Sequence, residues 1–337
     1  NCGRLSIHIA CECEDAVDIA QYLMEIYPES INIEDSGGCL PIHEAARGES
    51  FDLCKSLIDA NPESVQHRSI RGRLPIHEAC AESTIDIVKY MIKAYPDSIY
   101  VEDSRGRLPV HEAAGRRRQD AAKIKFLLDQ DAALAKACTR LSRYQSRYLP
   151  LHFACDGTAD LDVVQLLFDA HPEAIITLTG KGSDPLDLAK RYPKHDRSVA
   201  NAKVIDFLEA QMAYAHKAQD KRAMITLDDN GRLPLHQALR NNATLGAIKL
   251  LVKRNPSAVK VADDIAQSFP LHIACEFSSI AVVKYLLELN DSCLYHSDSN
   301  KNSTLHCACR GGNLEVVKYL LEKGFPTVSD RNADNKL

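Results

Sequence analysis

The chain has 337 residues, of which 26% are charged and 45% are apolar, and its formal net charge at pH 7 is −5. These proportions are typical of a folded, water-soluble protein. No apolar run reaches the roughly 18 residues that a membrane-spanning helix needs, so the sequence predicts no membrane span.

A seven-residue phrase recurs along the chain. Its clearest copies read LPIHEAA, LPIHEAC, LPVHEAA, LPLHFAC, LPLHQAL and FPLHIAC, at Leu40–Ala46, Leu74–Cys80, Leu108–Ala114, Leu149–Cys155, Leu233–Leu239 and Phe269–Cys275. Weaker copies read LSIHIAC, DPLDLAK and STLHCAC, at residues 5–11, 184–190 and 303–309. The histidine position recurs at intervals of 34 to 36 residues, with two exceptions of 41 and 49. This period predicts stacked supersecondary units, which offer a long binding face and usually no catalytic pocket.

The third unit shows how each repeat is built. Pro75 suits the first position of a short helix, because its fixed φ is helical and its missing N–H is not needed there. Thr84 can cap a second helix over Ile85–Tyr95, whose apolar residues recur at helical spacing. Asp97–Val101 is expected to run out as an extended segment, and Asp103–Arg107 to form a turn into the next unit.

The same pattern of a capping residue followed by a helix recurs in other units. The predicted second helices are Phe51–Ala60 after Ser50, Leu161–His171 after Asp160, Leu245–Asn255 after Thr244, Ile280–Asn290 after Ser279 and Leu314–Lys323 after Asn313. Each element is short and marginal alone, so stacking must supply most of its stability.

Two stretches break the period. The interval of 41 has about seven surplus residues, which we place in an enlarged basic finger over Thr139–Arg147. In the interval of 49, residues 190–198 break the first helix and Val199–Ala223 forms one long second helix. We therefore expect irregular insertions near 132–148 and 190–228. Insertions in a solenoid lie on one face and often carry function; alternatively, these units only bend the stack.

The phrase resembles the TPLHxA signature of the ankyrin repeat, which is a finger followed by two antiparallel helices. The last unit, residues 311–324, is the nearest match, and about nine units cover almost the whole chain. The resemblance implies an all-α, ankyrin-type solenoid with hairpin-like fingers over residues 1–337. Most copies carry Leu where the family has Thr, as at Leu40 and Leu74. Leucine cannot bond the motif histidine as threonine does, so each histidine must find backbone partners.

Catalytic and metal-binding chemistry finds little support in the sequence. Stacked units place the repeated histidines roughly 10 Å apart, which is too far for shared coordination. Five of the 12 cysteines occupy the last position of the phrase, where a free thiol serves as a small apolar side chain. No phosphate-binding loop, nucleophile elbow or zinc-protease motif occurs. We expect no catalytic residue, no metal, no cofactor and no small-molecule substrate, and an intracellular, reducing compartment such as the cytoplasm.

Charge is distributed unevenly. Residues 1–67 carry 3 Lys/Arg against 13 Asp/Glu, and residues 68–147 carry 16 against 10. Ankyrin-like stacks turn the position after the motif histidine toward the concave face, which predicts an acidic row there. Arginines after the finger glycines predict a second row, at the finger tips. The predicted partner contacts are Glu44, Glu78, Glu112, Arg73, Arg107, Phe153 and Arg232.

A basic patch in the middle of the chain offers an alternative. It consists of Arg116, Arg117, Arg118, Arg140, Arg143 and Arg147. Such a patch fits nucleic acid, but the negative net charge and the 6% aromatic content argue against it. An acidic protein segment or an anionic surface fits it at least as well.

These observations favour a protein-binding scaffold or adaptor whose concave face and finger tips contact a partner protein. The alternatives are the regulatory ankyrin region of a larger enzyme or channel, and a binder of nucleic acid or an anionic surface. The chain begins partway through a repeat and has no starting methionine, so we expect it to be part of a longer protein.

Overall fold

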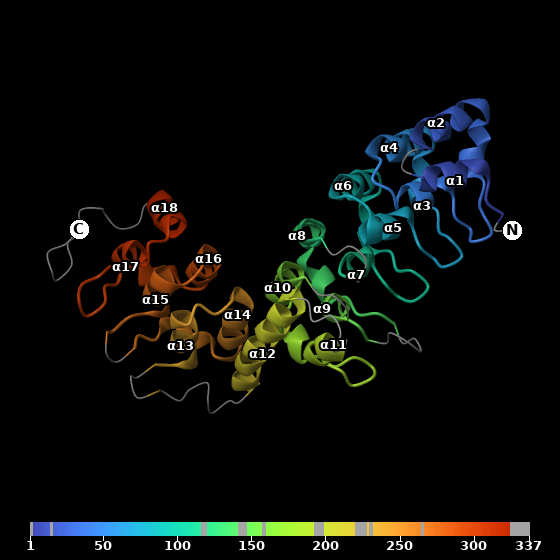
Figure 1. The fold of residues 1–337 in the computed structure, drawn as a ribbon. Helices are drawn as coiled ribbons and strands as arrows, with labels where there is room; N and C mark the ends of the chain where they lie inside the picture. Colours follow the sequence, from blue (N-terminus) through green and yellow to red (C-terminus); the bar gives the residue numbers. More distant parts are fainter. Residues whose placement is uncertain are drawn as a thin grey trace. The chain divides into compact units, whose positions relative to one another are not determined.

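The computed structural model describes residues 3–13, 16–115, 120–140, 147–156, 160–191, 199–219, 228, 232–263 and 266–323. Within these ranges the regular structure is entirely helical, with 18 α-helices and short 3-10 helices between them (Figure 1). The predicted all-α class is confirmed. Within the same ranges, no helix is long and apolar enough to cross a membrane.

The repeated phrase forms the first helix of each repeat. In most copies the leucine is extended, with φ near −80° and ψ near 160°, and the proline after it is the first helical residue, as predicted. The first helices are α1 (Ser6–Glu12), α3 (Pro41–Ala45), α5 (Pro75–Glu82), α7 (Pro109–Ala113), α9 (Pro150–Cys155), α11 (Pro185–Arg191), α13 (Pro234–Arg240), α15 (Pro270–Phe277) and α17 (Thr304–Gly311).

A second helix follows each first helix. These are α2 (Val17–Ile26), α4 (Phe51–Ala60), α6 (Ile85–Ala94), α8 (Ala121–Gln130), α10 (Leu161–Ala170), α12 (Val199–Gln219), α14 (Leu245–Arg254), α16 (Ile280–Leu289) and α18 (Leu314–Glu322). Of the predicted caps, Ser50, Asp160, Thr244 and Asn313 accept a backbone N–H of the first turn. Thr84 and Ser279 stand at the cap position without such a bond, so that part of the prediction is wrong.

The segment after the second helix is a 3-10 turn and not the extended strand predicted for 97–101. In the third repeat the amide of Ser98 donates to the carbonyl of Tyr95, and that of Val101 to Ser98. The turn buries Ile99 against the stack, which an extended chain leaving the helix would not do. The turns are η2 (Pro28–Asn32), η3 (Pro62–Gln66), η4 (Pro96–Tyr100), η5 (Ala132–Lys136), η6 (Pro172–Ile176), η7 (Pro256–Lys260) and η8 (Asp291–Tyr295).

Each finger is a narrow hairpin closed by its own backbone. The amide of Ser69 donates to the carbonyl of Arg73 at 3.0 Å, and that of Asp103 to Arg107 at 2.9 Å. Gly72 and Gly106 have φ of +69° and +72°, which glycine adopts without strain, so the predicted finger turns are confirmed.

The enlarged repeat holds its surplus residues in two places. The first residue of η5 lies 23 residues after the first residue of α7, whereas the first residue of η4 lies 21 residues after that of α5. Its finger closes from Thr139 to Tyr148, five residues wider than the finger before it. The prediction that the whole surplus lies in the finger is therefore wrong.

The chain divides into two compact units, Asn1–Leu208 and Glu209–Leu337, and the boundary runs through α12. In the first unit Phe207 packs edge-on against Phe168, with ring centroids 5.8 Å apart. In the second, Thr244 bonds Gln211 at 2.9 Å. The predicted long second helix is confirmed as far as Gln219. A single solenoid over the whole chain stays a prediction.

Candidate functional site

The motif histidines tie each repeat to the next. The backbone amide of Leu74 donates to Nδ1 of His77 at 3.1 Å, and Nε2 of His77 lies 3.2 Å from the carbonyl oxygen of Arg107 in the next repeat. Because Nδ1 accepts, the ring proton is on Nε2 and is donated forward. The expected backbone partners of the histidine are thus present, although leucine stands where the family has threonine.

The same pair of bonds is made by most of the other motif histidines. His43 accepts from Leu40 and bonds the carbonyl of Arg73, and His111 accepts from Leu108 and bonds Ala137. Burial lowers the pKa of His43 and of His111 to about 4. These rings are neutral structural links, with both nitrogens engaged by backbone.

The predicted acidic row lies inside a series of ion pairs. Glu44 is 3% exposed and its Oε2 lies 2.8 Å from Arg47 Nη1 and 3.1 Å from Arg4 Nη2. Burial raises the pKa of Glu44 despite these two arginines. The carboxylate therefore contacts the framework more than it faces solvent.

The next two carboxylates continue the pattern. Glu78 is bridged by Arg47 at 3.0 Å and Arg73 at 3.3 Å, and Glu112 by Arg73 at 3.1 Å and Arg107 at 2.9 Å. Burial opposes ionisation of Glu78, but Arg73 and Arg47 hold its pKa below the ordinary value. We call this alternating series the arginine–glutamate array. Its members are Arg4, Glu44, Arg47, Glu78, Arg73, Glu112 and Arg107.

The array changes how the predicted contact residues are placed. The structure brings together Glu44, Glu78 and Glu112 with Arg73 and Arg107, but it places both arginines at the bases of their fingers. The prediction that these arginines form the row at the finger tips is wrong. Side chains that follow the finger glycine turn inward, because the buried carboxylates need a counter-charge. That the array touches a partner stays a prediction.

The two remaining predicted contacts are also engaged. Phe153 is 7% exposed and packs edge-on against His111 and Tyr148, at centroid distances of 5.2 and 5.5 Å. Arg232 Nε lies 3.6 Å from Oδ2 of the buried Asp263 in the next repeat. Both side chains join neighbouring repeats.

Two arginines that sequence reasoning missed stand at the outer ends of the fingers. Arg71 and Arg105 each precede the positive-φ glycine of their finger, and both are exposed. Neither side chain makes a hydrogen bond or ion pair in the described part of the chain. The signal was present in the sequence as a basic residue directly before the glycine, in Ile70-Arg71-Gly72 and Ser104-Arg105-Gly106.

The predicted basic patch is described in part. Arg116, Arg117, Arg118 and Arg143 lie outside the described residues. Arg140 is 76% exposed and its Nη2 lies 2.6 Å from Glu102 Oε2 in the preceding finger. Arg147 has φ of +57° and closes the enlarged finger through its amide, 3.3 Å from the carbonyl of Thr139.

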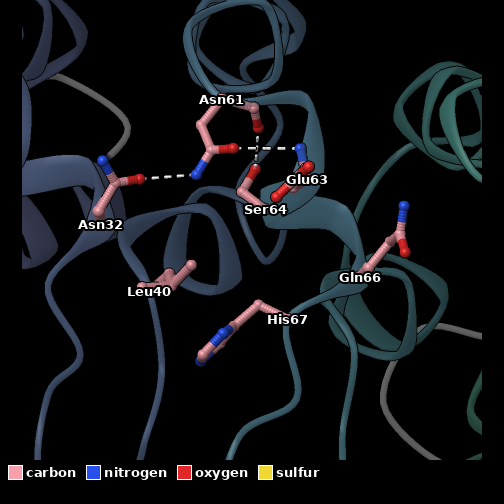
Figure 2. A pocket seen from close by; sticks show the side chains of 7 residues that line it. All are labelled: Asn32, Leu40, Asn61, Glu63, Ser64, Gln66 and His67. Atoms are coloured by element: carbon pink, nitrogen blue, oxygen red, sulfur yellow. Dashed lines mark hydrogen bonds between the residues drawn. The ribbon is translucent and has the colours of Figure 1, made fainter.

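A polar pocket of about 490 Å³ lies where η2 and η3 meet the fingers (Figure 2). In it, Asn61 donates to Asn32 of the preceding repeat at 2.6 Å and accepts the amide of Glu63. The ring of His67 turns toward the pocket, and its Nε2 bonds the carbonyl of Gly38. Its polar groups thus bond one another across the repeat boundary.

One trio of metal-ligand side chains is found among the described residues. Asp35, Cys39 and Glu44 place ligand atoms within 4.8 Å of one another. Asp35 accepts the amides of Gly37 and Cys39 in a finger turn, and Glu44 is paired with arginine. Burial raises the pKa of the Cys39 thiol to about 11, which disfavours the thiolate that a metal binds. These residues do not fit a metal site.

Comparison with protein families matches ankyrin repeats (3 copies) over residues 7–103, 76–179 and 235–332. The chain belongs to the ankyrin-repeat family. Ankyrin repeats are generally modules for protein–protein interaction. No curated protein matches the chain at the threshold of a second comparison.

Proposed function

We propose that the chain acts as a scaffold or adaptor that binds a partner protein, and that the fingers together with the concave face of the repeats carry the contact. The observation that supports this is a division between two sets of arginines. Those at the finger bases are bound to carboxylates of the repeats, whereas Arg71 and Arg105 at the tips are exposed and form no ion pair with any described residue. These two exposed positive charges are therefore candidates for recognition of a partner.

Local rigidity also supports the proposal. Neighbouring fingers are joined by backbone bonds, from the amide of Ile70 to the carbonyl of Gly37 and from Ser104 to Arg71, both at 2.9 Å. The tips are therefore held in a fixed order before a partner arrives, which reduces the entropy lost on binding. Ile70, which is 76% exposed, adds apolar surface between the charges.

Site-specific photo-crosslinking tests the proposal. A photoreactive phenylalanine analogue at Ile70 or Ser104 probes the finger tips, and the same analogue at Lys93 or Lys125 probes the exposed outer helices. In extract from the native source we expect the same protein adduct from both tip positions and not from the helix positions. Adducts that come equally from the outer helices, or from no position, would contradict the proposed surface.

The array itself is unsuited to charge-reversal tests of binding. Glu78→Lys or Glu112→Lys would place a third cation beside the arginines that already flank each carboxylate. The neutral substitutions Glu78→Gln and Glu112→Gln keep the shape of the side chain. Unchanged partner affinity in folded Gln variants would remove these two residues from the contact surface.

A further inference from the structure

Two consecutive fingers carry an arginine at equivalent outer positions, and the next finger adds one near its start. Arg71 and Arg105 precede the glycines of the second and third fingers, and Arg140 begins the fourth. A Cβ placed on Gly106 would lie 2.7 Å from the backbone nitrogen of Arg140, as one on Gly72 would lie 2.9 Å from that of Ser104. The fourth finger thus abuts the third as the third abuts the second.

The spacing between these cations follows from the fingers themselves. Each finger is a hairpin two extended segments wide, and backbone hydrogen bonds join the first finger to the second and the second to the third. Neighbouring extended segments lie about 5 Å apart, so equivalent positions on successive fingers repeat about every 10 Å. We call Arg71, Arg105 and Arg140 the tip row. Arg71 and Arg105 hold equivalent positions, and Arg140 lies one position earlier on its finger.

The acidic groups around the tip row are already engaged. Asp103 accepts two backbone amides of its own finger and pairs with Arg107 at 2.7 Å. Glu102 pairs with Arg140, and its carbonyl accepts from Arg68. This leaves the guanidinium groups of Arg71 and Arg105 facing solvent, with Arg140 76% exposed beside them.

A polyproline II segment matches the spacing of the tip row. It has three residues per turn and rises about 3.1 Å per residue, so every third side chain lies on one face about 9 Å from the last. A β-strand instead turns residues i and i+3 to opposite faces. Carboxylates at every third position of a polyproline II segment would therefore meet Arg71 and Arg105 in register.

We propose that the tip row binds an acidic, polyproline II-like segment of the partner protein, with Asp or Glu at every third residue. This inference rests on the proposed function and names the partner's chemistry at the finger tips. Nucleic acid is the disfavoured occupant. The described residues put no exposed aromatic side chain beside Arg71 and Arg105 on which bases could stack, and the neighbouring residues 1–67 carry a net negative charge.

The test uses the whole chain and three labelled peptides with the same number of glutamates in proline: at every second, every third and every fourth position. Fluorescence anisotropy should show the tightest binding for every third position. The substitutions Arg71→Ala and Arg105→Ala together should weaken that binding about tenfold, because two exposed charge pairs are lost. The matched control is Lys93→Ala with Lys125→Ala, which removes the same charge from the outer helices.

Each outcome decides the question. Equal affinity for the three spacings, or an equal loss in the Lys93/Lys125 control, would show non-specific charge attraction and overturn the inference. Tighter binding of an oligo-deoxythymidylate of matched length, lost in the Arg71/Arg105 variant, would assign the tip row to nucleic acid instead. If crosslinking at Ile70 still recovers a partner while spacing has no effect, the inference fails and the proposed function stands.

Discussion

The ring nitrogen Nε2 of His77 lies 3.2 Å from the carbonyl oxygen of Arg107, one repeat further along the chain. His77 is fully buried, and its other ring nitrogen already accepts the amide of Leu74. A second ring proton would therefore point at an N–H donor inside the stack. The amide of Leu74 can donate to Nδ1 only while the ring is neutral, whereas Nε2 donates to Arg107 in either state.

This geometry predicts that the first unit loses stability in mild acid. Burial lowers the pKa of His43, His77 and His111 from 6.5 to about 4. Between these values the unfolded chain binds more protons than the folded one, so stability is complete above pH 6.5 and falls as the pH drops toward 4. Each ring contributes up to about 1.4 kcal/mol per pH unit.

Urea unfolding between pH 7.5 and 5 measures this loss. His77→Gln should make the unfolding free energy depend less on pH, by roughly the contribution of one histidine, because glutamine has no proton to gain in this range. His216→Gln, which replaces an exposed histidine, should leave the dependence unchanged. A pH dependence that is the same in wild type and His77→Gln would contradict the assignment.

Lys123 is expected to stabilise the third and fourth repeats from inside. Its ammonium group is buried and donates to the carbonyls of Cys80 and Ser83 at 3.1 and 2.9 Å, at the end of α5. Lys123→Met keeps the length of the side chain but leaves these carbonyls without that donor, which should cost about 1–3 kcal/mol of unfolding free energy. Lys125→Met, on the exposed side of the same helix, should change it by less than about 0.5 kcal/mol.

The arginine–glutamate array predicts strong coupling between repeats. A double-mutant cycle on Arg47 and Glu78, whose atoms lie 3.0 Å apart with Glu78 buried, should give a coupling of about 1 kcal/mol. The exposed pair of Arg140 and Glu102 provides the comparison, with expected coupling between zero and about 0.5 kcal/mol. Equal coupling energies in the two pairs would mean that burial does not strengthen the ion pair.

Thiol reactivity should separate two classes of cysteine. Cys13, Cys138 and Cys309 are exposed, whereas Cys54 and Cys80 are buried and have pKa values raised to about 12 by burial. Ellman's reagent on the folded chain should modify the exposed set first, and mass spectrometry of peptides identifies the sites. Modification of Cys80 as fast as Cys309 would show that the stack opens readily.

The repeat period and its proline and histidine spacing were enough to predict the fold, because these residues act locally. Pro75 begins a helix and His77 bonds Leu74 three residues before it, which requires no knowledge of distant neighbours. The η turns were missed because the burial of Ile99 depends on the stack and not on its own segment.

The sequence could not predict which arginine side chains face solvent and which pair with carboxylates. Arg71 and Arg73 are two residues apart in one finger, yet the first faces solvent and the second pairs with Glu78 and Glu112. The choice is made by carboxylates that lie in the same and the following repeat, at positions that only stacking brings near. Placing charges on a repeat thus required the structure.

The forward donation from histidine gives the stack a polarity. In every bond of this kind seen here, from His8 to Cys39 through His272 to His296, the ring belongs to the earlier repeat and the carbonyl to the later one. Deleting a repeat from the carboxyl side removes the carbonyl acceptor of a histidine in the repeat that remains. Deleting a repeat from the amino side removes only the donor to a carbonyl at the outer edge. Shortening the protein from its two ends should therefore be unequally harmful.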